Sequence, residues 1–322
     1  MVQDSAHVGW SEEQWGRVNR TVQEEAQKAR IAAQFLPTST VTDPTVVAVP
    51  DLSLGANLLA SQDPVRRLQV SYTPGTFLAS ISVNVALTSR EAEDPEQRGA
   101  LIQFRKAANL IARVEDALIF CGQTGAGLPP VGVAGLPPVV RVSGGGNQPG
   151  LAVPPPLGPL VFLPRQDLPL KGGGNDLATQ IIAAVGLLEA AGHNRPFACV
   201  LSQDLFTELH VPSNSLVLPR DRVVPFFEGG PLLRSSTLPV GQGVVVALGG
   251  SPIEIVVAKE LKVRYLQTTT EPRHVIRVSE RLALRVTEWD SIVVLHKPES
   301  KEGPKNEPKQ EPKHEPKPTG GA

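Results

Sequence analysis

The chain has 322 residues, which is enough for one large domain or two modest ones, each with its own core. Hydrophobic residues make up 41% and charged residues 20%, as expected of a globular protein, and 31 Lys and Arg nearly balance 32 Asp and Glu. A net charge of -1 with 4% aromatic residues gives neither the basic surface nor the stacking rings of a nucleic-acid binder. We therefore expect no nucleic-acid partner.

The start of the chain has no basic segment followed by an apolar run, and no window holds the roughly 18 apolar residues that a membrane span needs. Its two cysteines, Cys121 and Cys199, lie far apart in apolar surroundings, which favours buried, unreactive thiols over a disulfide. We expect a cytoplasmic protein with no membrane partner.

The first predicted element is an amphipathic helix from Ser11 to Leu36, capped by Ser11 and stopped by Pro37. Its apolar residues recur at spacings of three and four and form one stripe: Trp15, Val18, Val22, Ala26, Ala29, Ala33 and Leu36. This stripe either docks on the core of its own chain or borders a groove for a partner peptide.

An extended, proline-rich excursion is predicted from Val41 to Thr76, with apolar runs at Thr45–Val49 and Leu68–Tyr72. A two-stranded hairpin that leaves a domain cannot bury both of its faces alone, so we expect a neighbouring subunit to cover it. The next segment, Phe77–Leu87, alternates apolar and polar residues as a half-buried strand does.

A long helix is predicted from Asp94 to Phe120, ended by Gly122. Residues 123–175 are dense in Gly and Pro, which favours loops with short strands at Val139–Val142 and Leu160–Leu163. A third helix, Leu177–Ala191, is capped by Asp176 and stopped by Gly192.

Short apolar segments follow and favour a strand at Phe197–Leu201 and a helix at Gln203–Leu209. The rest is rich in β-branched residues, and the predicted strands are Gly243–Leu248, Ile253–Val257, Leu261–Tyr265, His274–Ser279, Leu282–Thr287 and Ser291–Leu295. From Lys297 to Ala322 the chain repeats Lys-x-Glu-Pro, which favours a disordered tail.

Residue patterns that carry chemistry are weak. None of the six histidines has a Cys or carboxylate at the spacing of a zinc set, and the Gly-rich runs lack the Lys-Ser/Thr of a phosphate loop. Glu115 and Asp116 are adjacent on a helix, so they point in different directions and cannot act together on one substrate. We expect no catalytic residue, no metal site and no cofactor.

Several segments in this order resemble the encapsulins, shell proteins of bacterial and archaeal nanocompartments with the tailed-phage capsid fold. Residues 114–122 (Val-Glu-Asp-Ala-Leu-Ile-Phe-Cys-Gly) resemble the family's Glu-Asp-x-x-Ile-Phe-x-Gly motif, and residues 10–15 resemble its opening. Residues 134–136, 196–202, 228–232, 244–250 and 279–286 are similar to later family segments, so that the resemblance spans about Gly9 to His296.

The resemblance implies an α+β, Hong Kong 97-type capsid fold with a peripheral domain, an axial domain and an extended loop. The implied division of the chain is an N-terminal arm and helix at 1–40, the extended loop at 41–76, the peripheral domain with its spine helix at 77–122, a mainly axial part at 123–250, peripheral strands at 251–296 and the tail at 297–322.

By the same resemblance, the function is a self-assembling icosahedral shell that encloses a cargo enzyme for iron storage or oxidative-stress defence. The cargo, bound through a short targeting peptide, is expected on the N-terminal helix at Trp15, Val18, Val22 and Ala29. His210, Asn214 and Arg220 are expected to line the five-fold opening, and the tail decorates the outer surface, either passively or as a docking element.

Two other hypotheses stay open. A phage or prophage major capsid protein would have the same fold and would enclose DNA. An enzyme with its active site in the Gly/Pro-rich loops would be a discrete monomer with turnover.

Overall fold

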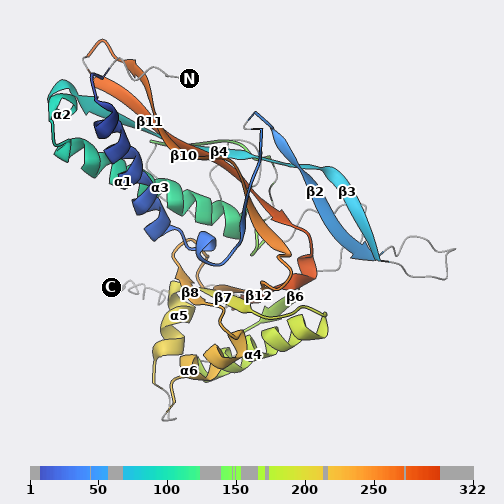
Figure 1. Cartoon of the computed structure of the whole chain (residues 1–322). Helices are drawn as coiled ribbons and strands as arrows, with labels where there is room; N and C mark the ends of the chain where they lie inside the picture. Colours follow the sequence, from blue (N-terminus) through green and yellow to red (C-terminus); the bar gives the residue numbers. More distant parts are fainter. Residues whose placement is uncertain are drawn as a thin grey trace, which may run out of the picture.

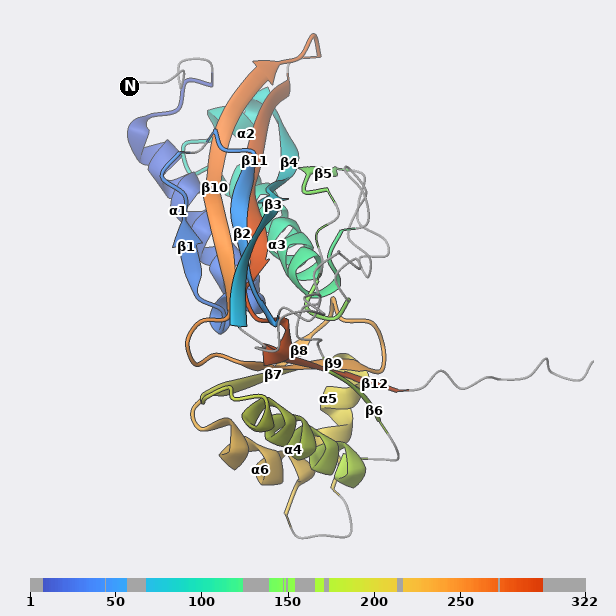
Figure 2. The ribbon, with the colours of Figure 1, turned by 90° about the vertical axis from the view of Figure 1, so that its right-hand side faces the viewer.

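The computed structural model describes residues 8–43, 45–56, 68–123, 139–146, 148, 150–153, 166–170, 174–212, 217–271 and 273–297, and of 51–56, 68–74, 174 and 175 the backbone alone. Two sheets, each covered by helices on one face, lie one beyond the other, and a thin hairpin projects sideways (Figures 1 and 2). The predicted strand at Leu160–Leu163 and the tail beyond Lys297 lie outside the described residues.

The first sheet has five strands in the order β1-β10-β11-β4-β5. Their bounds are Thr38–Thr40, Ile253–Thr268, Arg273–Val286, Ala79–Thr88 and Val140–Gly144. In β4 the alternation works as predicted, because Ile81, Val83, Val85 and Leu87 are buried and the residues between them are not. One face of this sheet therefore carries the larger core.

The strands β10 and β11 are much longer than predicted. Each joins two segments that we expected to be separate strands. Lys259 and Glu260 suggested a turn, but they are accommodated as irregularities in the register between Val257 and Lys262. Both residues are exposed, so the charged pair can stay in the strand.

Helices α1 (Glu12–Ala29) and α3 (Arg98–Cys121) cover the apolar face of this sheet (Figure 1). Ser11 and Gln14 form the predicted capping box on α1, and Gly122, with φ 71°, ends α3 as predicted. The predicted extension of α1 to Leu36 is wrong: the helix ends at Ala29, and a 3-10 turn follows at Ala32–Gln34. A short helix, α2 (Ser89–Glu93), precedes α3.

The second sheet also has five strands, in the order β6-β12-β9-β7-β8. They are Gln166–Pro169, Ile292–His296, Gln242–Ala247, Phe197–Ser202 and Leu232–Ser235. Helices α4 (Gly174–Ala190), α5 (Gln203–His210) and α6 (Pro219–Val223) pack with it around a second core.

One strand departs from the expected division of the chain. β12 was expected to lie beside the other strands at 251–296, which form part of the first sheet. It pairs instead with β6 and β9 in the second sheet. The chain crosses between the sheets in the connection from Val286 to Ile292, which contains a 3-10 turn at Trp289–Ser291. A sequence of β-branched residues does not state which sheet a strand joins, so this crossing was not predictable.

Strands β2 (Ala48–Ala56) and β3 (Leu68–Phe77) form a separate two-stranded sheet, the extended hairpin. It leaves the body where Leu78 leads into β4 (Figures 1 and 2). At its base Val49, Leu78, Val256, Ala258 and Ala283 form a small third cluster on the sheet face opposite α3. The predicted excursion is therefore a hairpin attached at its base.

Candidate functional site

The N-terminal helix is fixed to the body of its own chain. Trp10 donates a hydrogen bond from Nε1 to the Ala92 carbonyl (2.7 Å), and its ring packs edge-on against Trp15 and Phe104. Further along, Asn19 accepts a hydrogen bond from the backbone N–H of Val263 (3.3 Å). These contacts hold α1 across α3 and β10.

The end of α1 is held by a buried cluster of charged groups. Arg30 donates from Nε to Oε2 of Glu115 on α3 (2.6 Å), and its Nη2 pairs with Glu280 on β11. Both carboxylates are almost fully buried, so each depends on this guanidinium for compensation. Burial raises the pKa of Glu115, and burial together with the nearby Glu115 raises the pKa of Glu280 well above its usual range.

Asp116 acts on the backbone that follows the helix. Its carboxylate accepts the N–H groups of Ile31 (3.0 Å) and Ala32 (2.9 Å). These bonds redirect the chain and explain why α1 stops at Ala29 although its apolar spacing continues. Glu115 and Asp116 thus serve different partners, as their adjacency predicted.

The pKa of Asp116 makes stability depend on pH. Burial raises this pKa to about 7, although the hydrogen bonds from the two N–H groups act to lower it. Because the folded pKa lies above the unfolded value, the contribution of this group to stability is fully present below about pH 4 and is lost as the pH rises through about 7, by up to about 4 kcal/mol. We expect Asp116→Asn to flatten the fall in melting temperature between pH 5 and 8, measured by scanning fluorimetry.

The control for this prediction is Glu93→Gln, a change at an exposed residue at the end of α2. It should leave the pH profile of the melting temperature unchanged. A profile for Asp116→Asn as steep as that of the unchanged protein would show that Asp116 does not take up a proton on folding in this range.

The predicted cargo residues are not all accessible. Val18 and Val22 are fully buried between α1 and the core, so the structure corrects their assignment to a peptide groove: they pack inward. Trp15 and Ala29 are half-buried, and their contact with cargo stays a prediction. The exposed positions of α1 are polar apart from Gly16 and include Glu12, Arg17, Arg20, Glu24 and Lys28.

Two of the predicted pore residues, His210 and Arg220, lie on α5 and α6, the helices that pack with the second sheet. His210 ends α5, where its ring stacks against Phe206 and its Nδ1 lies 2.7 Å from the Phe206 carbonyl oxygen. Arg220 is exposed on α6, and Asn214 lies outside the described residues. Val211, Val217 and Phe226 near them are also about half exposed. The pore role of this segment stays a prediction.

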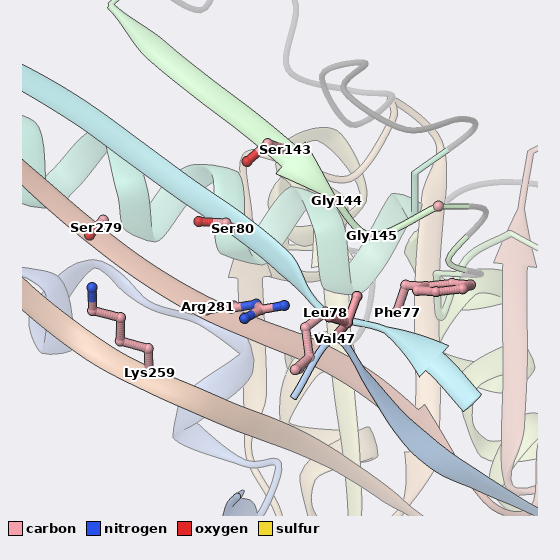
Figure 3. Close-up of a pocket in the computed structure, with 11 residues that line it drawn as sticks. Val47, Phe77, Leu78, Ser80, Ser143, Gly144, Gly145, Lys259, Ser279 and Arg281 are labelled. Carbon is pink, nitrogen blue, oxygen red and sulfur yellow. The ribbon is translucent and has the colours of Figure 1, made fainter. Parts of the chain in front are cut away.

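A pocket opens at the base of the extended hairpin (Figure 3). Its apolar side is formed by Val47, Leu78 and Phe77, and its polar side by Ser80, Ser143, Lys259, Ser279 and Arg281. Val47 and Phe77 are 60% and 54% exposed, so two large apolar side chains face solvent here. Burial and the neighbouring cations Arg264, Lys262 and Arg277 lower the pKa of Lys259. This apolar and basic surface was not predicted, because it forms only when β10, β11 and the hairpin meet.

The two cysteines carry no reactive thiol. Cys121 and Cys199 are free and buried, and burial raises the pKa of Cys121 to about 11, which keeps the thiol protonated. No helix in the described ranges combines the length and apolar character of a membrane span.

A long helix across a sheet, a projecting hairpin and a second sheet with its own helices together form the fold of tailed-phage capsid proteins. A virus-like particle from Pyrococcus furiosus matches with a TM-score of 0.59 at 13% identity, covering 89% of this chain and 100% of that one. The capsid of a native GTA particle matches at 0.54 and 15% identity (83% and 89% covered), and that of Myoviridae phage XM1 at 0.52 and 12% (82% and 90%). The predicted fold is therefore confirmed.

Sequence comparisons narrow this class. The type 1 encapsulin shell protein EncA of Myxococcus xanthus is 26% identical over 293 residues, which cover 88% of this chain and 92% of EncA. The family described as "Encapsulating protein for peroxidase" (Linocin_M18) matches residues 162–283. The chain is thus similar in sequence to encapsulin shell proteins, over most of its length in the case of EncA.

Proposed function

We propose that this chain assembles with copies of itself into a closed icosahedral container in the cytoplasm and encloses a cargo enzyme there. The observation that carries the proposal is the extended hairpin: its base presents Val47 and Phe77 to solvent in the isolated subunit. Apolar surface left open on one chain is buried at low cost by a second copy, and repetition of such a head-to-tail contact under rotational symmetry closes a shell.

The cargo is proposed to be a ferritin-like protein or a peroxidase bound through a short targeting peptide, in the service of iron storage or oxidative-stress defence. Support comes from the matched family, whose description names a peroxidase as the enclosed protein. On this chain the remaining contacts proposed for the peptide are Trp15 and Ala29. His210, Asn214 and Arg220 are proposed to line an opening through which small substrates pass.

Negative-stain microscopy of the protein expressed alone tests the container. We expect hollow particles of uniform size that elute in the void range of a sizing column. A discrete monomer at micromolar concentration would contradict the proposal, and particles filled with DNA would favour a phage capsid protein instead.

Co-expression with a candidate cargo tests the enclosed enzyme. We expect a ferritin-like protein or peroxidase that carries its C-terminal peptide to copurify inside the particles and to resist added protease. The matched control is the same cargo without that peptide, which should remain outside. Equal copurification of both forms would contradict peptide-directed loading.

A further inference from the structure

A cluster of three metal-ligating side chains lies where the chain crosses between the two sheets. His193 follows α4 in the turn that leads to β7, and Glu288 and Asp290 lie in the connection from β11 to β12. One ligand atom from each lies within 4.8 Å of the other two. His193 lies 95 positions before Glu288 and 97 before Asp290 in the sequence, so no spacing rule could have joined it to them.

The geometry of the histidine points to a shared cation. His193 has only 7% of its side chain exposed, and its buried Nε2 makes no hydrogen bond. Yet Oδ1 of Asp290 lies 3.2 Å from that nitrogen. Two ligand atoms bound to one tetrahedral ion at about 2.0–2.1 Å each lie roughly 3.3 Å apart, so this separation suits a common metal ion.

The surrounding backbone holds the ligands in place. The N–H of His193 bonds to the Leu188 carbonyl (3.0 Å), which fixes the turn after α4. On the other side Thr287 donates from its backbone N–H to Pro252 (2.8 Å), and Ser291 donates from its backbone N–H to the Glu288 carbonyl (3.2 Å). Trp289 stands between the two carboxylate residues in the sequence. It is buried, and this limits the movement of both neighbours. Such pre-organised supports are what a metal site requires.

The cluster is also accessible. His193 lines an open depression together with Glu189, Gly192, Asn194 and Arg195. Oε2 of Glu288 lies 3.7 Å from Nδ1, the other ring nitrogen of His193, and the side chain is about a third exposed, so its carboxylate has to turn toward Nε2 to join the ion. Three protein ligands leave room for water on the solvent side.

We propose that His193, Glu288 and Asp290 bind one divalent transition-metal ion, such as Zn²⁺, through one nitrogen and two carboxylate oxygens. The ion ties the turn before β7 to the connection between the two sheets and stabilises their junction. Imidazole with carboxylates suits Zn²⁺, Co²⁺ and Mn²⁺ better than Mg²⁺ or Ca²⁺, which prefer oxygen ligands alone.

The test uses the full-length protein in its native assembled state. The protein is first treated with a chelator, and Zn²⁺ uptake is then measured by equilibrium dialysis with metal analysis. The unchanged protein should bind one equivalent of Zn²⁺ more than Asp290→Asn. The affinity of the variant for Zn²⁺ should be lowered at least tenfold. Glu288→Gln should give the same loss, and it keeps the proposal testable if Asp290→Asn does not fold. The matched control, Glu189→Gln, changes a carboxylate of the same depression and should bind normally.

Co²⁺ supplies a second readout, because its visible absorption reports the coordination geometry. We expect bands of a four- or five-coordinate nitrogen and oxygen site in the unchanged protein, and their loss in His193→Gln. Equal Zn²⁺ uptake in the unchanged protein, Asp290→Asn and Glu288→Gln would overturn the proposal. So would a complete lack of uptake.

Discussion

Replacing Arg30 with Met is expected to destabilise the protein by about 3–5 kcal/mol, because the change leaves two buried carboxylates without a compensating charge. Glu115 and Glu280 are 3% and 2% exposed, so water does not replace the lost guanidinium. For a chain of this length the melting temperature should fall by roughly 10 °C, measured by scanning fluorimetry with circular dichroism as a check of the fold.

The penalty of Arg30→Met should depend on pH. Both carboxylates already have a raised pKa in the folded protein, and loss of Arg30 raises it further. Protonation removes the buried charge, so the difference from the unchanged protein should be smaller at pH 5 than at pH 8. The triple change Arg30→Met, Glu115→Gln and Glu280→Gln should recover most of the loss, since a neutral cluster needs no counter-ion.

Arg17→Met is the matched control for Arg30. Arg17 lies on the same helix, is 42% exposed along its side chain and pairs with the exposed Glu13 at 3.6 Å. Its replacement should change stability by no more than about 0.5 kcal/mol. Equal effects of the two substitutions, or a loss in Arg30→Met that does not change with pH, would mean that the cluster does not anchor the helix.

This cluster also shows why part of the molecule was not predictable from its sequence. The start of α1, the end of α3 at Gly122 and the alternation in β4 follow from local rules of capping and periodicity. The end of α1 does not, because Asp116 reaches it from 84 residues further along the chain. The periodicity of α1 predicted its apolar stripe, but it did not show that Val18 and Val22 face the core of the chain and not a cargo peptide.

The merging of strands has a similar cause. Lys259 and Glu260 interrupt the β-branched pattern, and only pairing with β11 shows that the strand continues through them. The capsid fold was nevertheless predictable, because motifs such as residues 114–122 stand in a fixed order along the chain. The pocket at the hairpin base and the cluster at His193 were not, since each joins segments that are distant in sequence.

The base of the extended hairpin is where assembly should be most sensitive to substitution. We expect Phe77→Ser, and more strongly Phe77→Ser with Val47→Ser, to prevent particle formation while leaving the subunit folded. Burial of a Phe side chain contributes about 1.5–3 kcal/mol, so each lost contact should raise the concentration needed for assembly about tenfold or more. Mass photometry over a concentration series measures this threshold, and circular dichroism checks the fold.

Ile102→Ser provides the control that separates a contact between subunits from a general loss of apolar surface. Ile102 is 66% exposed, as open as Val47, but it lies on α3, on the sheet face opposite the hairpin base. Because Ile102 is not part of the hairpin base, this change should leave the assembly threshold within about twofold of the unchanged protein. If Ile102→Ser abolished particles as Phe77→Ser does, or if Phe77→Ser assembled normally, the hairpin base would not be the surface that joins neighbouring copies, and the contact that closes the shell would have to lie elsewhere on the subunit.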